Sequence, residues 1–245
     1  VRGLDGIVQI DTLKTPSVQL DEIRFDVSSD IDNTSYELKV ANGKDNPQYS
    51  FTARLAGEML ANGSSATLTI DDKDGRRGID IGLSALMEAD GIRMKIAERE
   101  QILGYRTFMP NEGNYVFFGK GMRVSADLKL QADDGTGVQI YTNDDNLEAL
   151  QDITLSLHKL DIAGLLSVVP YTPDITGVLD GDFHAIISGK DMSISSDIRL
   201  QNLCYEGCLM GNISSEIVYM PQADGSHHVD GILYKDEKEV ASIVG

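Results

Sequence analysis

Histidines and their acidic neighbours are the residues of this chain whose types could support catalysis or metal binding, but their spacing favours neither. His227 and His228 are adjacent. Because adjacent residues on a strand point to opposite faces, this pair would not chelate one ion. We interpret it as part of a solvent-exposed turn. His184 shares the polar face of its predicted strand with Asp182, but neither a nucleophile nor a third ligand accompanies them, and a solvated strand face explains the pair better.

The acidic run Asp71-Asp72-Lys73-Asp74-Gly75 has the composition of a calcium loop but not its register. Such a loop has its glycine at position 6 and a glutamate at position 12. Counting from Gly75 puts Ile70 at position 1 and Ile81 at position 12, so we expect a hairpin turn here. The sequence has no P-loop, dinucleotide-binding or nucleophile-elbow motif. We therefore predict a protein that is not an enzyme and that has no catalytic residues, metal or cofactor.

The two cysteines, Cys204 and Cys208, are close in the sequence. On one straight strand their spacing would separate them by ~13 Å, which is too far for a disulfide. A bulge or turn at Gly207 would bring them together, so a bridge stays open as an alternative. We favour two small apolar side chains, since no second pair of cysteines or histidines has zinc spacing.

Composition and charge exclude some partners. Lys and Arg number 21 against 39 Asp and Glu, a net charge of −18, which phosphate backbones and anionic membrane surfaces repel. We therefore expect no nucleic-acid partner. Apolar residues make up 41% of the chain, yet no run approaches the ~20 residues of a membrane span, and no signal peptide is recognisable. The chain begins Val-Arg-Gly, so we expect a fragment of a longer protein.

Many segments alternate between apolar and polar residues with a period of two, which is the pattern of half-buried strands. A strand covered on both faces in a parallel sheet would be apolar throughout, so antiparallel pairing is predicted. Dipeptides that end in glycine have the chemistry of tight turns. These predicted turns lie at Asn42-Gly43, Asn62-Gly63, Asp74-Gly75, Asp90-Gly91, Asp134-Gly135, Asp180-Gly181, Ser188-Gly189 and Asp224-Gly225.

One segment breaks this rhythm. Apolar residues at helical spacing predict a short helix over Asp161–Val168, which Pro170 and Pro173 would end. A weaker helical pattern covers Asn146–Gln151. The alternation also fades over residues 98–110, which we interpret as a weak boundary. Otherwise residues 1–245 are predicted to form one continuous repetitive β region.

A succession of short motifs occupies the stretch from Ile153 to Tyr219. The sequence ITLSLHKLDIAGLL at 153–166 predicts a strand that leads into the short helix. Pro170 and Pro173 precede ITGVLDGDF at 175–183, and LMGNI at 209–213 precedes another alternating strand. This succession resembles the repeating unit of the TamB/AsmA-like family (translocation and assembly module subunit TamB, DUF490-type), with the Bacteroidetes branch the most similar. The motifs cover the last hundred residues or so, and the rest of the chain is similar only in its hairpin rhythm.

The resemblance implies a fold, a function and a location. Members of this family have an inner-membrane anchor and a long periplasmic repeat region that folds as a curled sheet, the β-taco, with a greasy interior. The family is associated with phospholipid transport between the inner and outer membranes of Gram-negative bacteria and with outer-membrane biogenesis. The implied partners are phospholipid acyl chains and an outer-membrane TamA/BamA-like protein. This chain has no anchor segment of its own in the sequence given, and we expect the anchor in the parent.

The fold we predict is all-β, an elongated, curled antiparallel sheet of many short strands with one or two short helices. About fifteen strands at ~4.8 Å spacing would make a sheet ~70 Å long, and open sheets of that size curl or split. A β-taco or open half-barrel would expose a hydrophobic groove to lipid. The alternative is a closed sandwich core, as in a structural or adhesive module of a surface protein. The residues expected to line the groove are Phe51, Leu68, Ile81, Leu83, Val124, Leu128, Phe183 and Ile198.

Overall fold

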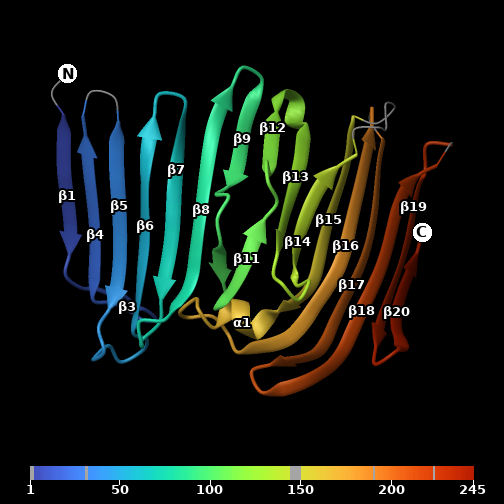
Figure 1. The fold of residues 1–245 in the computed structure, drawn as a ribbon. Coiled ribbons are helices and arrows are strands. Elements are labelled where there is room, and N and C mark those ends of the chain that lie inside the picture. The colour runs from blue at the N-terminus through green and yellow to red at the C-terminus, as the bar shows by residue number, and fades with distance from the viewer. Residues whose placement is uncertain (1–2, 31–32, 144–149, 190, 223) are drawn as a thin grey trace. The chain divides into compact units, whose positions relative to one another are not determined.

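The alternating segments form antiparallel strands that follow one another along the chain (Figure 1). The computed structural model describes residues 3–30, 33–143, 150–189, 191–222 and 224–245. The all-β prediction, with many short antiparallel strands and little helix, is confirmed. The chain divides into two compact units. Unit 1 comprises Val1–Pro110 and Gly164–Thr172, and unit 2 comprises Asn111–Ala163 and Pro173–Gly245.

Unit 1 is an antiparallel meander. Strand β1 pairs with β4, and β4 to β8 each pair with the next strand along the chain. Strand β8 is long enough to pair with two short strands, β10 along its first half and β9 along its second, and β10 pairs with β11. Strands β2 and β3 form a small separate ladder. The strands are β1 (Leu4–Ile10), β2 (Leu13–Lys14), β3 (Gln19–Leu20), β4 (Glu22–Ser29), β5 (Thr34–Asn42), β6 (Phe51–Leu60), β7 (Gly63–Asp71), β8 (Arg77–Glu88), β9 (Gly91–Ile96), β10 (Gln101–Leu103) and β11 (Arg106–Pro110).

Unit 2 is a second antiparallel meander, in which the strands from β12 to β20 pair in sequence order. Its longest strands, β16 to β18, curve along their length (Figure 1). Register shifts interrupt their ladders, and bulges of this kind bend a strand. The elements are β12 (Tyr115–Gly119), the 3-10 turn η1 (Lys120–Met122), β13 (Val124–Gln131), β14 (Gly137–Thr142), β15 (Gln151–Asp161), β16 (Ile175–Ser188), β17 (Asp191–Tyr205), β18 (Cys208–Pro221), β19 (His227–Lys235) and β20 (Lys238–Val244).

The predicted helix is present but shorter than expected. Helix α1 spans Ile162–Leu166 and follows β15 directly. The helix predicted over Asn146–Gln151 falls largely outside the described residues, and Gln151 itself begins β15. One predicted turn is wrong. Asp180-Gly181 lies inside β16, where Asp180 pairs with Arg199, because cross-strand pairing outweighs the local turn preference of Asp-Gly.

Little of the chain is sealed from solvent. Many large apolar side chains are more than one-third exposed, among them Val8, Phe25, Leu83 and Ile243. The apolar side chains that are buried among the described residues are Phe51, Ile70, Ile79, Phe108, Ala126, Leu130, Ala132, Leu160 and Val168. The strands therefore form open sheets in which most apolar side chains are only partly covered.

Candidate apolar binding surface

Apolar side chains stand in register across the strands of unit 1. Strand pairing places directly opposite one another, in order from β1 to β8, the residues Val8, Phe25, Leu38, Leu55, Leu68 and Ile81. A second row, one step along each strand on the same face, is Ile10, Ile23, Val40, Ala53, Ile70 and Ile79. Since side chains alternate between faces, these rows give one face of the sheet a continuous apolar cover. We call this the apolar face of unit 1.

The expected groove residues of unit 1 all lie on this face. Leu68 and Ile81 are cross-strand partners, and Leu83 pairs with Ala66 in the next row. Phe51 stands at the start of β6 opposite Asn42. Phe51 is buried, Leu68 and Ile81 are half-buried, and Leu83 is exposed. These four residues therefore extend along the apolar face from its buried end at Phe51 to its exposed end at Leu83.

Unit 2 has an apolar face of the same construction. Its central row crosses four strands and consists of Leu128, Ile140, Leu155 and Phe183. Two of the expected groove residues, Leu128 and Phe183, therefore belong to one row. Ile198 lies beside that row, opposite Gly181, and Val124 pairs with Phe118 on β12. All four expected residues of unit 2 are half-buried.

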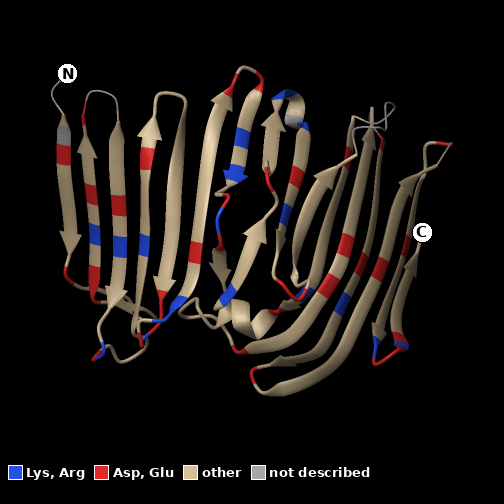
Figure 2. Cartoon of the chain, viewed as in Figure 1, with Lys and Arg blue, Asp and Glu red and all other residues tan. Residues whose placement is uncertain are grey.

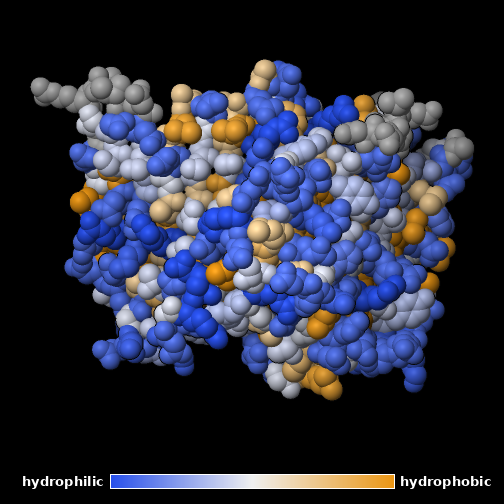
Figure 3. Space-filling model, viewed as in Figure 1, coloured by the Kyte–Doolittle hydropathy of each residue, from blue (hydrophilic) through white to orange (hydrophobic). Residues whose placement is uncertain are grey.

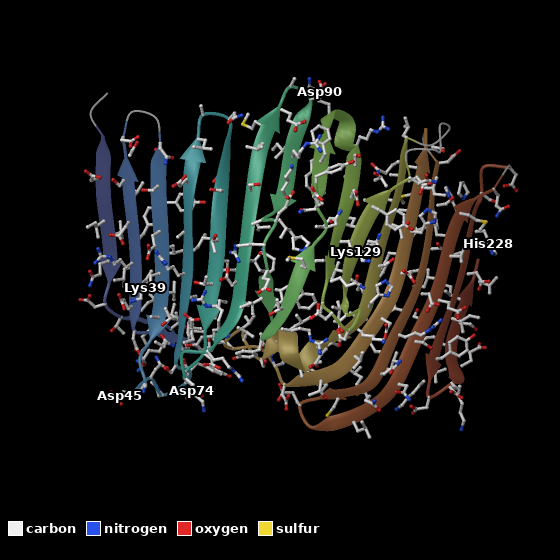
Figure 4. The ribbon with its side chains drawn as sticks, viewed as in Figure 1. Lys39, Asp45, Asp74, Asp90, Lys129 and His228 are labelled. Carbon is white, nitrogen blue, oxygen red and sulfur yellow. The ribbon has the colours of Figure 1, made fainter. Side chains whose placement is uncertain are left out.

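The opposite face of unit 1 is polar and carries several ion pairs. Arg24, Lys39 and Arg54 are register partners on β4, β5 and β6, and their bands lie side by side in Figure 2. Arg24 contacts Asp26 at 2.7 Å, and Arg54 contacts Glu37 at 2.6 Å. The hydrogen bond from each guanidinium lowers the pKa of its carboxyl partner. Lys39, labelled in Figure 4, pairs with Glu22 at 3.0 Å.

One hollow of unit 1 lies over β1 and β4 to β7. Its volume is about 620 Å³. Three adjacent cross-strand rows line it. Two are polar-face rows, one with Asp26 and Glu37 and the other with Ser28, Ser35 and Ser65, and between them lies the apolar-face row of Gly6, Val27, Tyr36, Gly57 and Ala66. The groove expected on the apolar face stays a prediction.

Unit 2 presents an acidic row on its own polar face. Asp182, Asp197 and Glu216 are register partners on β16, β17 and β18 (Figure 2). Ser156 donates a hydrogen bond of 2.6 Å to Asp182, and Arg199 pairs with Asp197 at 2.6 Å. In the view of Figure 3, hydrophilic side chains cover most of the surface over the strands of each unit.

Three of the histidines have neighbours that the sequence did not indicate. His184 contacts Asp152 on β15 at 2.8 Å, whereas Asp182, which shares its strand face, accepts a hydrogen bond from Ser156. His227 and His228 begin β19 and do not belong to the preceding turn, and the His227 ring stacks on Tyr219 at 5.4 Å. The part of the chain that the structure describes has no group of three or more His, Cys, Asp or Glu residues placed to hold a metal ion.

The acidic run 71–75 and the cysteines have structural explanations. The Asp72 carboxylate accepts hydrogen bonds from the backbone N–H groups of Asp74 and Arg76. The bond from Arg76 is the main cause that lowers the pKa of Asp72. This is the predicted hairpin turn. Cys204 and Cys208 are free thiols, because Cys204 pairs with Leu209 while Cys208 pairs with Tyr205, which places the two thiols on opposite faces of the hairpin.

The sequence predicted the short helix but not which strands the residues that follow it would cover. The segment Gly164–Thr172 belongs to unit 1, and its Val168 packs against Ile70 and Ile79 on the apolar face. The sequence signals only a short helix followed by two prolines. Nothing in a local pattern shows that Val168 would contact residues about ninety positions earlier.

Comparisons with protein families, with curated proteins and with solved structures find no match to this chain. Among the described residues, no helix has both the length and the hydrophobicity that a membrane span requires.

Proposed function

We propose that the apolar faces of this protein hold phospholipid acyl chains, as part of a non-enzymatic, TamB-like envelope protein that moves phospholipid between membranes. The observation that carries the proposal is the in-register apolar row of unit 1, which crosses six strands from Val8 to Ile81. The matching row of unit 2 supports it. Acyl chains need extended apolar contact without directional bonds, and such rows supply that contact.

The exposure of these rows also supports the proposal. Soluble proteins rarely leave contiguous apolar surface uncovered unless something binds there. Val8, Phe25 and Leu83 on the apolar face of unit 1 are each exposed by more than one-third. The alternative, an adhesive module with a dry sandwich core, would bind through loops and would need these side chains to be sealed. The resemblance of residues 153–219 to TamB/AsmA-like repeats adds the periplasmic location, the anchored parent and the outer-membrane TamA/BamA-like partner to the proposal.

Adjacent residues that face opposite sides provide matched probes for a test. A photo-crosslinking amino acid at Phe183 or Leu128 would lie on the apolar face of unit 2, while the neighbours His184 and Lys129 lie on its polar face. We expect phospholipid to crosslink to the first two positions and not to the second two. Leu68 and Thr67 form the same pair in unit 1, where the buried Phe51 is a poorer probe.

Native mass spectrometry supplies an independent readout. We expect phospholipid to co-purify with the protein when it is isolated without detergent. Equal crosslinking from both faces, or a protein that carries no lipid and crosslinks none when vesicles are added, would contradict the proposal.

A further inference from the structure

The segment Gly164–Thr172 is built into one end of the apolar face of unit 1. The side chain of Val168 is 5% exposed and lies against Ile70 and Ile79. A register shift between Ile70 and Asp71 bulges β8 at Gly78. A bulge turns two consecutive residues toward the same side, so Gly78 faces Val168. A β-carbon on Gly78 would come within 2.7 Å of Val168 Cγ2. Val168 can therefore pack in this position only because residue 78 is glycine.

Polar contacts fix the remainder of this segment. Tyr171 donates a hydrogen bond of 2.9 Å to the backbone carbonyl of Gln19 and accepts one of 3.2 Å from the buried Asn42 side chain. The Tyr49 ring meets the Tyr171 ring edge-on at 4.8 Å. A second glycine, Gly104, has φ +60°, and a β-carbon there would lie 2.6 Å from the carbonyl oxygen of Gly164. Hydrogen bonds, a ring contact and a close backbone approach therefore fix this segment, in addition to the apolar contact of Val168.

The opposite ends of the same strands are uncovered. Exposure rises along the apolar side of β8 from 8% at Ile79 through 41% at Leu83 to 68% at Met87. Met59 on β6 and Met94 on β9 are exposed at the same end and belong to one cross-strand row. Methionine is flexible and adapts to irregular apolar ligands. We call this end the methionine rim.

We infer that Gly164–Thr172 is an end stop, and that an acyl chain enters the apolar face of unit 1 from the methionine rim with its methyl end directed toward Val168. The inference rests on the proposed function and adds the direction and the blind end of the site. From Ile79 to Met87 the strand rises by ~27 Å. One leaflet of a bilayer is about 15 Å of hydrocarbon, so a chain fits without displacing Val168.

Charged side chains lie near both ends of these strands. Glu88 and Arg93 pair at the methionine rim at 2.5 Å, and Asp90, labelled in Figure 4, lies in the adjoining turn. Ion pairs also lie near the covered end, where Arg77 pairs with Asp80 at 3.2 Å beside Ile79, so the cover by Val168, and not the charge, distinguishes the two ends.

Two photoactivatable phosphatidylcholines test the orientation on the unmodified protein. One carries a diazirine next to the head group and the other at the chain terminus, and the labelled peptides are identified by mass spectrometry. We expect the first probe to label Met59 or Met87 and the second to label Leu68 or Ile81, with each label assigned to its residue by fragmentation, since no Lys, Arg, Asp or Glu separates Met59 from Leu68 or Ile81 from Met87. The reversed distribution, or the same distribution from both probes, would overturn the orientation while leaving the lipid-binding proposal standing. No labelling by either probe would contradict both.

A substitution at Gly78 tests the end stop itself. Gly78→Ala should displace Val168 from the apolar face. We then expect the terminal probe to label Ile79 about fivefold more strongly or better, which is the ratio that corresponds to a small cost of packing the added methyl group against Val168. Gly43→Ala is the matched control, because a β-carbon there meets only Asp21 at 4.0 Å. Val168→Ala opens the same position without overpacking and serves if Gly78→Ala misfolds by circular dichroism. Unchanged labelling of Ile79 in both variants would overturn the end stop.

Discussion

Val168 occupies the space that a side chain on Gly78 would need, with its Cγ2 atom 2.7 Å from where the β-carbon would stand. The two residues are distant in sequence and belong to the same unit. Their contact covers one end of an apolar face that is otherwise open, so it defines where the core of unit 1 ends and where its free surface begins.

Gly78→Ala is expected to destabilise unit 1. Forcing a methyl group into a filled site costs about 1–3 kcal/mol. Denaturant unfolding measures the change, with Gly43→Ala as the control that should stay within about 0.5 kcal/mol. The double variant Gly78→Ala with Val168→Ala should lose less than the sum of the single variants, by about 0.5–3 kcal/mol. Strict additivity would show that the two side chains do not compete for one space.

Tyr171→Phe removes the hydroxyl that bonds to Gln19 and Asn42. We expect a loss of about 1 kcal/mol in the free energy of unfolding, with the ring contact to Tyr49 retained. Tyr141→Phe is the control, since the Tyr141 side chain is exposed and the described residues show no partner for its hydroxyl. Equal effects of the two substitutions would mean that the Tyr171 hydroxyl contributes nothing to holding the segment.

Acid should weaken unit 1 through its ion-paired carboxylates. Arg54 lowers the pKa of Glu37 below its ordinary value of 4.5, and Arg24 lowers the pKa of Asp26 below 3.8. Because the pKa of each of these carboxyls is lower in the folded protein than in the unfolded chain, the unfolded chain binds protons at a higher pH. The stabilisation is therefore present above the ordinary value and is lost as the pH falls through the lowered one.

The measurement is the urea midpoint of unfolding between neutral pH and about pH 3, a range that spans the ordinary carboxyl pKa values. Glu37→Gln should show a shallower acid decline than the unmodified protein, because one of the titrating groups is gone. Thr52→Gln, on the same polar face but without a charge, should leave the decline unchanged. A urea midpoint that falls more steeply with acid in Glu37→Gln than in the unmodified protein would contradict this prediction.

Cys204 and Cys208 should remain unpaired even under oxidising conditions. The hairpin register holds their side chains on opposite faces, and a bridge would require the strands to separate. Thiol titration of the native protein should find two reactive groups, the exposed Cys208 reacting faster than the half-buried Cys204. A mass loss of two hydrogens with no free thiol would contradict this register.

The fold class could be read from the alternation of residues such as Arg54 and Leu55, because a strand with one polar and one apolar face can pair only in a half-covered sheet. The same alternation placed Leu68, Ile81, Leu128 and Phe183 on apolar faces. It could not show which part of an apolar face would be covered, since the contact of Val168 with Ile70 and Ile79 depends on how distant segments pack.

The sequence by itself determined that strands would pair antiparallel, that one side of each would be apolar, and that the acidic run ending at Gly75 would form a turn, since these follow from the side-chain period and local hydrogen bonding. Only the tertiary structure decided that His184 meets Asp152 and that Val168 covers Ile79. Both contacts join residues from different strands or segments. Their partners depend on how strands align across the sheet and on a bulge at Gly78, and no local pattern encodes either.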